Sequence, residues 1–334
     1  MKRLLAILLT LLLASLACSL DFSPPPLSFT PAPLALTSTP ILLPPTLAPS
    51  PLPPTATETP IPPPATASIP ELTVDRLRNA TLTLLDANQT LQTVTFTNGV
   101  YQSGSDPAQP GYVSMTLGQQ IAFGDLNGDG LDDAAITLGE NGGGTGVFVS
   151  LVAVINQAGQ PVVVASQPID DRPIINNLLI ENGRIFLDAT VHGLQDAMCC
   201  ATLGTTRRYQ LETGSLRLTE FTSQVSEGVA RVITLTAPAA GSEISGPFVV
   251  SGTVTVSPFE NNLVYRVYLP GTEEPVAESG FIISADGLGG PGSFDLPLDF
   301  SAAGFHGPVR LVILDLSPAD GSIQALASLD LTLK

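Results

Sequence analysis

Carboxylate side chains recur at the first, fifth and ninth positions of the stretch that begins at Asp125, with an amide side chain at the third. Calcium in proteins takes six to eight oxygen ligands, and alternate residues of a tight loop can point toward one centre. Gly128 and Gly130 permit the tight backbone that such a loop needs. We therefore predict a Ca²⁺ site with side-chain oxygens from Asp125, Asn127, Asp129 and Asp133 and the backbone carbonyl of Leu131.

The segments on either side of this loop are short and apolar, which predicts a strand on each side. An EF-hand would need a glutamate at the twelfth position, where this chain has Ile136. The loop instead resembles the calcium loops of FG-GAP repeats, in which the ninth-position aspartate replaces that glutamate. The alternative is an acidic hairpin turn built on Asn-Gly and Asp-Gly that holds no metal.

Two adjacent cysteines, Cys199 and Cys200, are the only thiols that follow Cys18. An even number of thiols outside the cytosol predicts a disulfide, here between neighbours in the chain. The alternatives are two reduced thiols, or half of a zinc site completed in part by His192.

Residues suited to catalysis are few. The histidines are His192 and His306, and no serine has the setting of a nucleophile elbow. Asp170 and Asp171 form a carboxylate pair of the kind that glycoside hydrolysis uses, but acidic residues are abundant throughout this chain. We therefore expect no catalytic residues, and keep a hydrolase acting on envelope polysaccharide as the alternative.

Charge and composition exclude some partners and favour short strands. The chain has 13 basic and 30 acidic residues, a net charge of −17, which argues against nucleic acid and anionic membrane surfaces. It has 31 prolines, 30 glycines and no tryptophan, a composition typical of strands joined by turns.

The N-terminus predicts export. Lys2 and Arg3 precede a small and apolar run over residues 4–17, which is short for a transmembrane helix and stops at Cys18. The arrangement resembles a bacterial lipobox, which implies removal of residues 1–17, lipidation of Cys18 and an extracytoplasmic protein anchored to the lipid bilayer of the cell membrane. A plain signal peptide or an uncleaved anchor is the alternative. Cleavage would remove Lys2 and Arg3 and leave a charge of −19.

Residues 18–70 predict a disordered tether. Prolines occupy 17 of the positions from Ser19 to Pro70, and proline removes backbone donors and fixes φ. Such a segment favours polyproline II, with a rise of about 3.1 Å per residue.

Residues 71–225 predict an α+β domain with a mainly antiparallel sheet. Thr73 can cap a short helix, and strands are expected at residues 81–85, 93–97, 121–123, 134–138, 147–156, 162–167, 174–181, 184–192 and 205–211. The order of the helix, the acidic loop, Asp171-Arg172 and residues 196–200 resembles an uncharacterised domain of exported bacterial lipoproteins that reads Cys-Cys-Pro-Thr, where this chain has Cys-Cys-Ala-Thr.

Residues 231–334 predict an immunoglobulin-like β-sandwich. Val250, Gly252, Val254 and Val256 alternate on one strand, and seven strands are expected in all, at residues 232–237, 248–256, 263–269, 280–285, 293–300, 309–316 and 323–333. Residues 238–241, 245–247, 259–263 and 317–322 resemble the immunoglobulin-like domain of bacterial spore-germination proteins. This resemblance implies an extracytoplasmic binding or spacer module. The whole chain therefore predicts an outward-facing lipoprotein that binds or scaffolds an envelope protein or polysaccharide without catalysis.

Overall fold

Strands make up most of the described chain, and only one short α-helix accompanies them. The computed structural model describes residues 69–86 and 90–334, so the predicted signal sequence, Cys18 and the proline-rich tether lie outside the described residues. Every strand pair is antiparallel except that between β14 and β21. The mainly β fold class is therefore confirmed. Within the described residues, no helix has the length and apolar character needed to cross a membrane.

The helix α1 (Val74–Arg78) begins where the sequence predicts it. The side-chain oxygen of Thr73 accepts a hydrogen bond from the amide of Arg76 at 3.2 Å, which caps the first turn. Leu77 faces inward and is fully buried. The helix is too short to be stable alone, so its contact with the sheet below stabilises it.

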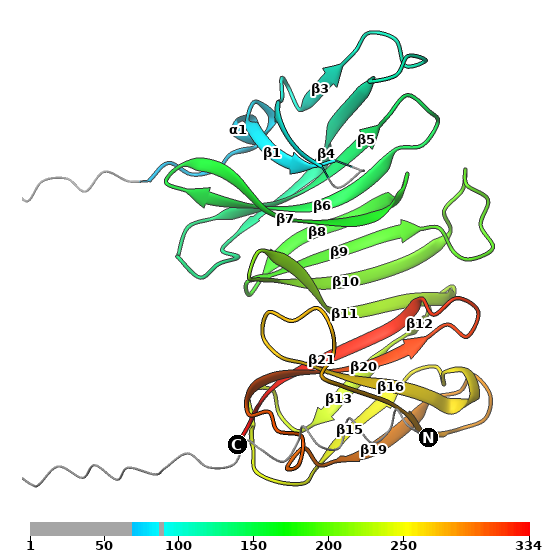
Figure 1. Cartoon of the computed structure of the whole chain (residues 1–334). Coiled ribbons are helices and arrows are strands. Elements are labelled where there is room, and N and C mark those ends of the chain that lie inside the picture. The colour runs from blue at the N-terminus through cyan, green and yellow to red at the C-terminus, as the bar shows by residue number, and fades with distance from the viewer. Residues whose placement is uncertain (1–68, 87–89) are drawn as a thin grey trace, which may run out of the picture. The chain divides into compact units, whose positions relative to one another are not determined.

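The first module consists of three layers (Figure 1). Its central layer is a five-stranded sheet with the strands in chain order: β3 (Val100–Ser103), β4 (Val113–Gly124), β5 (Asp133–Asn141), β6 (Phe148–Gln157) and β7 (Gln160–Asp171). One face is covered by α1 and the hairpin of β1 (Thr81–Leu85) and β2 (Leu91–Thr95), with Phe96, Met115 and Ile136 in the core between them. The other face packs Leu151 against Ile185 and Leu187 of the next sheet.

The largest sheet runs through both parts of the chain. Its path is β8 (Ile174–Glu181), β9 (Arg184–Val191), β10 (Leu203–Glu212), β11 (Ser215–Ser226), β21 (Ile323–Leu333), β20 (Gly307–Leu316), β16 (Asn262–Tyr268) and β17 (Ala277–Ile282), with β12 (Val229–Arg231) on β11 and β14 (Glu243–Ile244) on β21. Strand β21 pairs with β20 along its length and with β11 through Glu220–Ala327 and Phe221–Leu326. The sequence pattern does not predict this shared ladder.

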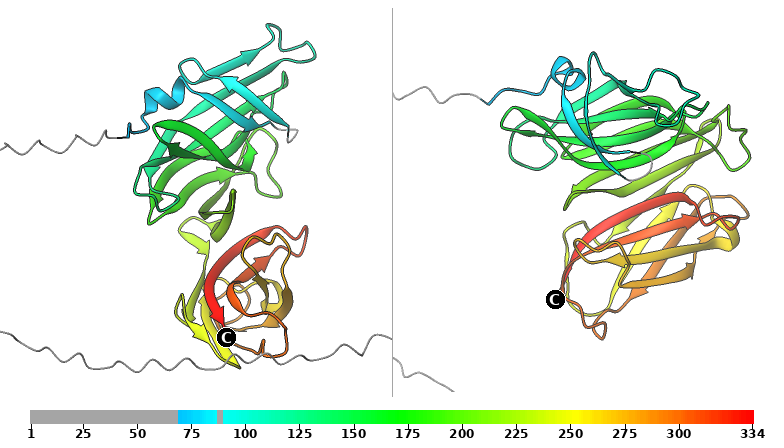
Figure 2. Two further views of the ribbon diagram at one scale, coloured as in Figure 1. Left: turned by 60° about the vertical axis from the view of Figure 1, so that its left-hand side comes forward. Right: turned by 45° about the horizontal axis from the view of Figure 1, so that its top comes forward.

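The C-terminal part is a two-sheet sandwich (Figure 2). Strands β16, β20 and β21 pack against a four-stranded sheet of β13 (Ile233–Ala237), β15 (Phe248–Val254), β19 (Gly292–Leu298) and β18 (Ser284–Ala285). Val250 and Val254 of β15 and Phe294 and Leu296 of β19 are buried between the sheets. The alternation predicted from the sequence places the correct side chains in this core.

The junction is the β11–β21 ladder together with the buried apolar cluster Phe221, Val312, Leu314 and Leu326. The Ser223 hydroxyl also donates to the Gln324 carbonyl at 2.6 Å. Backbone pairing and apolar burial therefore both connect the two modules, and all described residues belong to one compact unit that runs from Ala65 to Lys334.

Candidate functional site

The acidic loop connects β4 to β5, with Gly124 opposite Asp133 in the ladder. The Asp125 carboxylate accepts hydrogen bonds from the backbone amides of Gly128 at 2.6 Å and Gly130 at 2.9 Å. These amides, that of Gly130 first, hold the pKa of Asp125 below its usual range. Asp125 therefore stays ionised and organises the turn around its own carboxylate.

Asp133 is fully buried at the start of β5. One carboxylate oxygen accepts from the Leu126 amide and the other from the Asn156 amide, each at 2.9 Å. Burial raises the pKa of Asp133, these two amides act in the opposite direction, and the charges of Asp129 and Asp125 raise it further. Asp133 thus ties the loop to β6 and lies close enough to the other two carboxylates to interact with them.

The remaining predicted ligands also bond within the loop. The side-chain oxygen of Asn127 accepts from the Asp129 amide at 2.9 Å, and Asp129 accepts from the Leu131 amide at 2.8 Å. The donor set consists of the hard oxygens that calcium prefers, and a carboxylate oxygen can accept a hydrogen bond and still ligate through its other lone pair. However, across residues 69–86 and 90–334, no three acidic, histidine or cysteine side chains are grouped closely enough to hold a metal. The calcium site stays a prediction.

His192 follows β9 and pairs with Asp170 of β7. Its Nδ1 lies 2.8 Å from an Asp170 carboxylate oxygen, which also accepts the His192 backbone amide at 2.5 Å. The hydrogen bond to Asp170 raises the pKa of His192. The neighbouring Asp171 instead pairs with Arg172 at 2.6 Å, so each of the two adjacent carboxylates has its own partner.

The loop between β9 and β10 is closed by Asp196, whose carboxylate accepts the amides of Gly193 at 2.8 Å and Thr202 at 2.7 Å. These bonds, that of Gly193 first, lower the pKa of Asp196. At the exposed turn of this loop, Cys199 and Cys200 are joined by a disulfide. Of the three arrangements that the sequence allows for these cysteines, the structure thus contains the disulfide.

Arg172 connects this loop to the end of β7, because its guanidinium donates to the Met198 carbonyl at 2.6 Å. Asp171-Arg172 and residues 196–200, related in the sequence only by their order, are therefore neighbours in space. Beside them is a cavity of about 400 Å³ lined by Phe148, Ile169, Asp170, Asp171 and Met198 among others.

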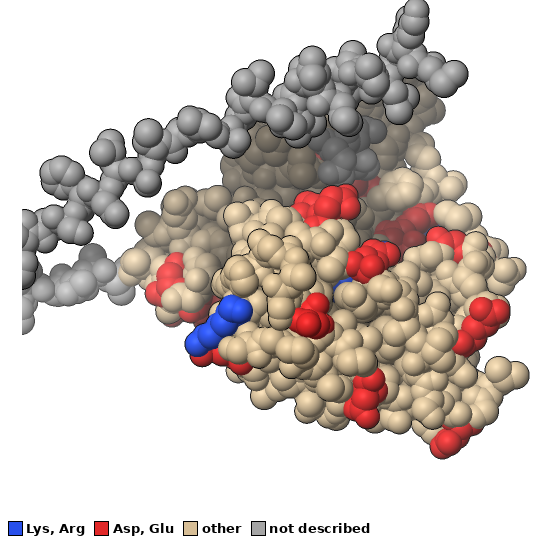
Figure 3. All heavy atoms as spheres, turned by 60° about the horizontal axis from the view of Figure 1, so that its bottom comes forward, with Lys and Arg blue, Asp and Glu red and all other residues tan. Residues whose placement is uncertain are grey.

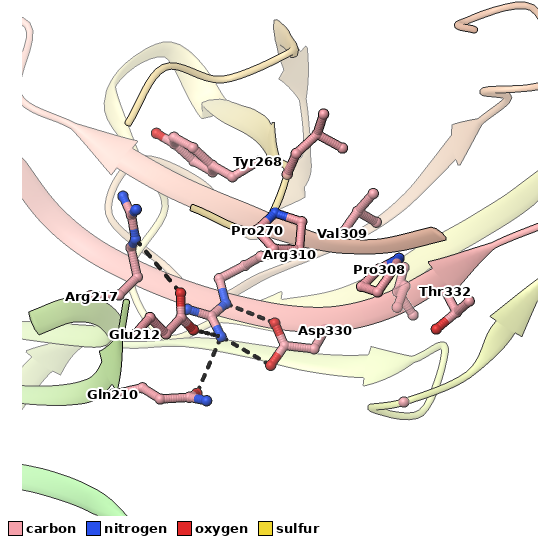
Figure 4. A pocket seen from close by; sticks show the side chains of 13 residues that line it. Gln210, Glu212, Arg217, Tyr268, Pro270, Pro308, Val309, Arg310, Asp330 and Thr332 are labelled. Atoms are coloured by element: carbon pink, nitrogen blue, oxygen red, sulfur yellow. Dashed lines mark hydrogen bonds and ion pairs between the residues drawn. The ribbon is translucent and has the colours of Figure 1, made fainter. Parts of the chain in front are cut away.

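A second cavity, of about 320 Å³, lies at the junction and is lined by residues of both modules (Figure 4). At its centre is Arg310, whose side chain is only 10% exposed. The Arg310 guanidinium contacts Glu212 at 2.5 Å, Asp330 at 2.7 Å and the side-chain oxygen of Gln210 at 3.1 Å. Arg310 of the sandwich, paired with Asp330 of the same module, thus binds Gln210 and Glu212 of the first module.

Sequence reasoning did not identify these junction residues. The available signal was an arginine inside an otherwise apolar strand, at Val309-Arg310-Leu311-Val312. A charged residue at such a position is seldom buried without a partner. The pattern does not identify that partner, because Gln210 and Glu212 lie about a hundred residues earlier in the chain.

These contacts and the fold define a mainly β protein in which an α+β module continues into an immunoglobulin-like sandwich. Residues 232–322 match the family described as the immunoglobulin-like domain of bacterial spore germination. The predicted resemblance of the C-terminal part is therefore confirmed. No curated protein matches the chain.

Proposed function

We propose that the protein is an outward-facing, membrane-anchored lipoprotein that acts as a non-catalytic binding or scaffolding module. The observation that supports this most is the junction. A shared β ladder, a buried apolar cluster and the Arg310 contacts fix the sandwich to the first module. Such a fixed pair of modules suits the presentation of a binding surface at a set orientation.

The charge of the surface narrows the class of partner. Asp and Glu side chains are scattered over the face shown in Figure 3, where Lys and Arg are scarce, in keeping with 30 acidic against 13 basic residues. An acidic surface repels nucleic acid and anionic lipid. The proposed partner is an envelope protein or polysaccharide, and the contact with the bilayer is made by the lipid on Cys18.

Replacing Cys18 with serine is expected to release the protein from the membrane fraction or to block its processing, because the lipidated thiol is lost. Fractionation of cells followed by immunoblotting measures this. The control is the double variant Cys199→Ser and Cys200→Ser, which removes the other two cysteines and should stay membrane-bound. A Cys18→Ser protein that is processed normally and stays in the membrane would contradict the lipid anchor.

We also expect the compact unit that begins at Ala65 to bind a component of an envelope fraction in a saturable way. Immobilised protein is mixed with solubilised envelope protein and, separately, with envelope polysaccharide, with and without calcium. Unlabelled protein should compete for the bound component.

A screen of the same unit against envelope polysaccharide tests the hydrolase alternative. Turnover that disappears in an Asp170→Asn variant would overturn the non-catalytic assignment.

We also propose that Ca²⁺ bound at Asp125, Asn127, Asp129, Leu131 and Asp133 stabilises the first module.

A further inference from the structure

An open groove of about 500 Å³ lies on the other side of Tyr268 and Arg217 from the Arg310 contacts and crosses the junction. Its floor is formed by the partly exposed Leu218 and Ile323. Beneath them are Phe221, Val312, Leu314 and Leu326 of the buried junction cluster. Strand β7 contributes one wall through Gln167 and Pro168. The groove thus combines polar and apolar surface from both modules.

The charged residues that line the groove are three arginines, Arg207, Arg217 and Arg266, and one glutamate, Glu273. Arg217 bonds to Glu273 and to the Thr272 carbonyl, and Arg266 pairs with Glu278 at 2.8 Å. The charges of Arg217 and Arg266 are therefore matched by carboxylates of the same chain, which leaves Arg207 as the groove's unpaired cation among the described residues.

Arg207 differs from the other two arginines because no carboxylate of the described residues pairs with it. Its guanidinium lies over the Phe221 ring, with the central carbon 5.5 Å from the ring centroid. Its Nε is buried and has no hydrogen-bond partner among the described residues. A guanidinium stacked on an aromatic ring can still present its two terminal nitrogens to a carboxylate, which accepts two parallel hydrogen bonds from them.

We propose that the groove binds the free carboxylate end of an apolar peptide, with Arg207 holding the carboxylate and the apolar floor holding the adjoining side chains. The Gln167 side chain favours a peptide over a hydrocarbon chain. It has no hydrogen-bond partner among the described residues, and its amide can both donate to and accept from a peptide backbone. This inference rests on the proposed binding function and names the chemistry of one ligand.

The test uses the full chain in detergent and a fluorescein-labelled peptide, Ala-Leu-Leu-Phe, with either a free carboxylate or a carboxamide at its C-terminus. Fluorescence anisotropy measures both affinities. We expect the carboxylate form to bind about tenfold more tightly, since a hydrogen bond to a charged group contributes at least that factor. Arg207→Met should abolish this preference and Arg207→Lys should reduce it.

The matched control is Arg184→Met, which removes one positive charge outside the groove, from an exposed pair with Glu220. It should keep the preference for the carboxylate form. If Arg207→Met does not fold, the loss of preference in Arg207→Lys carries the test.

Equal affinity for the two peptides in wild type, an unchanged preference in Arg207→Met, or no binding of either at millimolar concentration overturns the inference. So does laurate that binds more tightly than the peptide and displaces it. If the peptide inference fails but the protein still binds the envelope fraction, the proposed binding function stands. If the protein keeps its preference for the carboxylate peptide but does not bind the envelope fraction, only the proposed function is contradicted.

Discussion

Replacing Arg231 with methionine is expected to lower the free energy of unfolding at pH 7 by about 3 kcal/mol, in the range found when a buried ion pair loses one member. Arg231 of β12 contacts the Asp315 carboxylate of β20 at 3.1 Å. Asp315 is only 3% exposed, so the variant leaves a carboxylate buried without its cation. Urea unfolding followed by circular dichroism measures the change.

The loss of unfolding free energy in Arg231→Met should depend on pH. Burial raises the pKa of Asp315 above its ordinary value even with Arg231 opposing it, and without Arg231 the pKa rises further. A carboxyl group with a raised pKa in the folded state favours folding most below its unfolded pKa of about 3.9, and this contribution is lost as the pH rises through the folded value. The free energy of unfolding of the variant should therefore be closest to that of wild type near pH 4, and the difference should grow as the pH approaches 7.

Lys334→Met is the matched control, because it removes the same charge from an exposed pair with Glu243. Exposed pairs contribute about 0–1 kcal/mol. A loss for Arg231→Met that is no greater than for Lys334→Met, or that does not change with pH, would show that Asp315 is not a buried charge.

Millimolar calcium is expected to raise the thermal midpoint of the first module. The carboxylates of Asp125 and Asp129 interact unfavourably with that of Asp133, and a cation would relieve this repulsion. A ligand that binds only the folded state stabilises it by about 2.7 kcal/mol at a hundredfold excess over Kd. Calorimetric scans in calcium and in chelator measure the shift, which Asp129→Ala should remove.

Asp132 supplies the control for that experiment. It is exposed, stands next to Asp133 and is not a predicted ligand, so Asp132→Ala should keep the calcium response. Asp133→Ala would be a poor probe, because it also leaves the buried amides of Leu126 and Asn156 without their acceptor. If chelator does not change the wild-type midpoint and titration shows no binding, the loop is an acidic turn.

Much of the fold could be predicted because it depends on local patterns. The bounds of β1, β8 and β21 agree with the sequence ranges, because each is rich in apolar residues and begins or ends at a turn. Strand β11 was missed. Its ladder with β10 shifts register between Arg208 and Tyr209, and this bulge interrupts the alternation.

The candidate sites also differ in how far they could be predicted from the sequence. The acidic loop could be located because its residues are consecutive and its hydrogen bonds span at most seven positions within the loop. The Asp170–His192 pair joins residues 22 positions apart, and the contact of Arg310 with Gln210 joins residues 100 positions apart. Pairings at that distance depend on the arrangement of strands, which alternation in a single sequence does not specify.

The position of β21 has a consequence for biosynthesis. This strand follows β11 by about a hundred residues in the chain, yet it lies inside the largest sheet with β20 on one side and β11 on the other. During synthesis from the N-terminus, Phe221 of β11 therefore gains its partner Leu326 only after about a hundred further residues have been made. Until then β11 is unpaired on that edge at Glu220 and Phe221, beside exposed apolar side chains, a combination that promotes aggregation. Loss of β21 would therefore damage the first module as well as the sandwich.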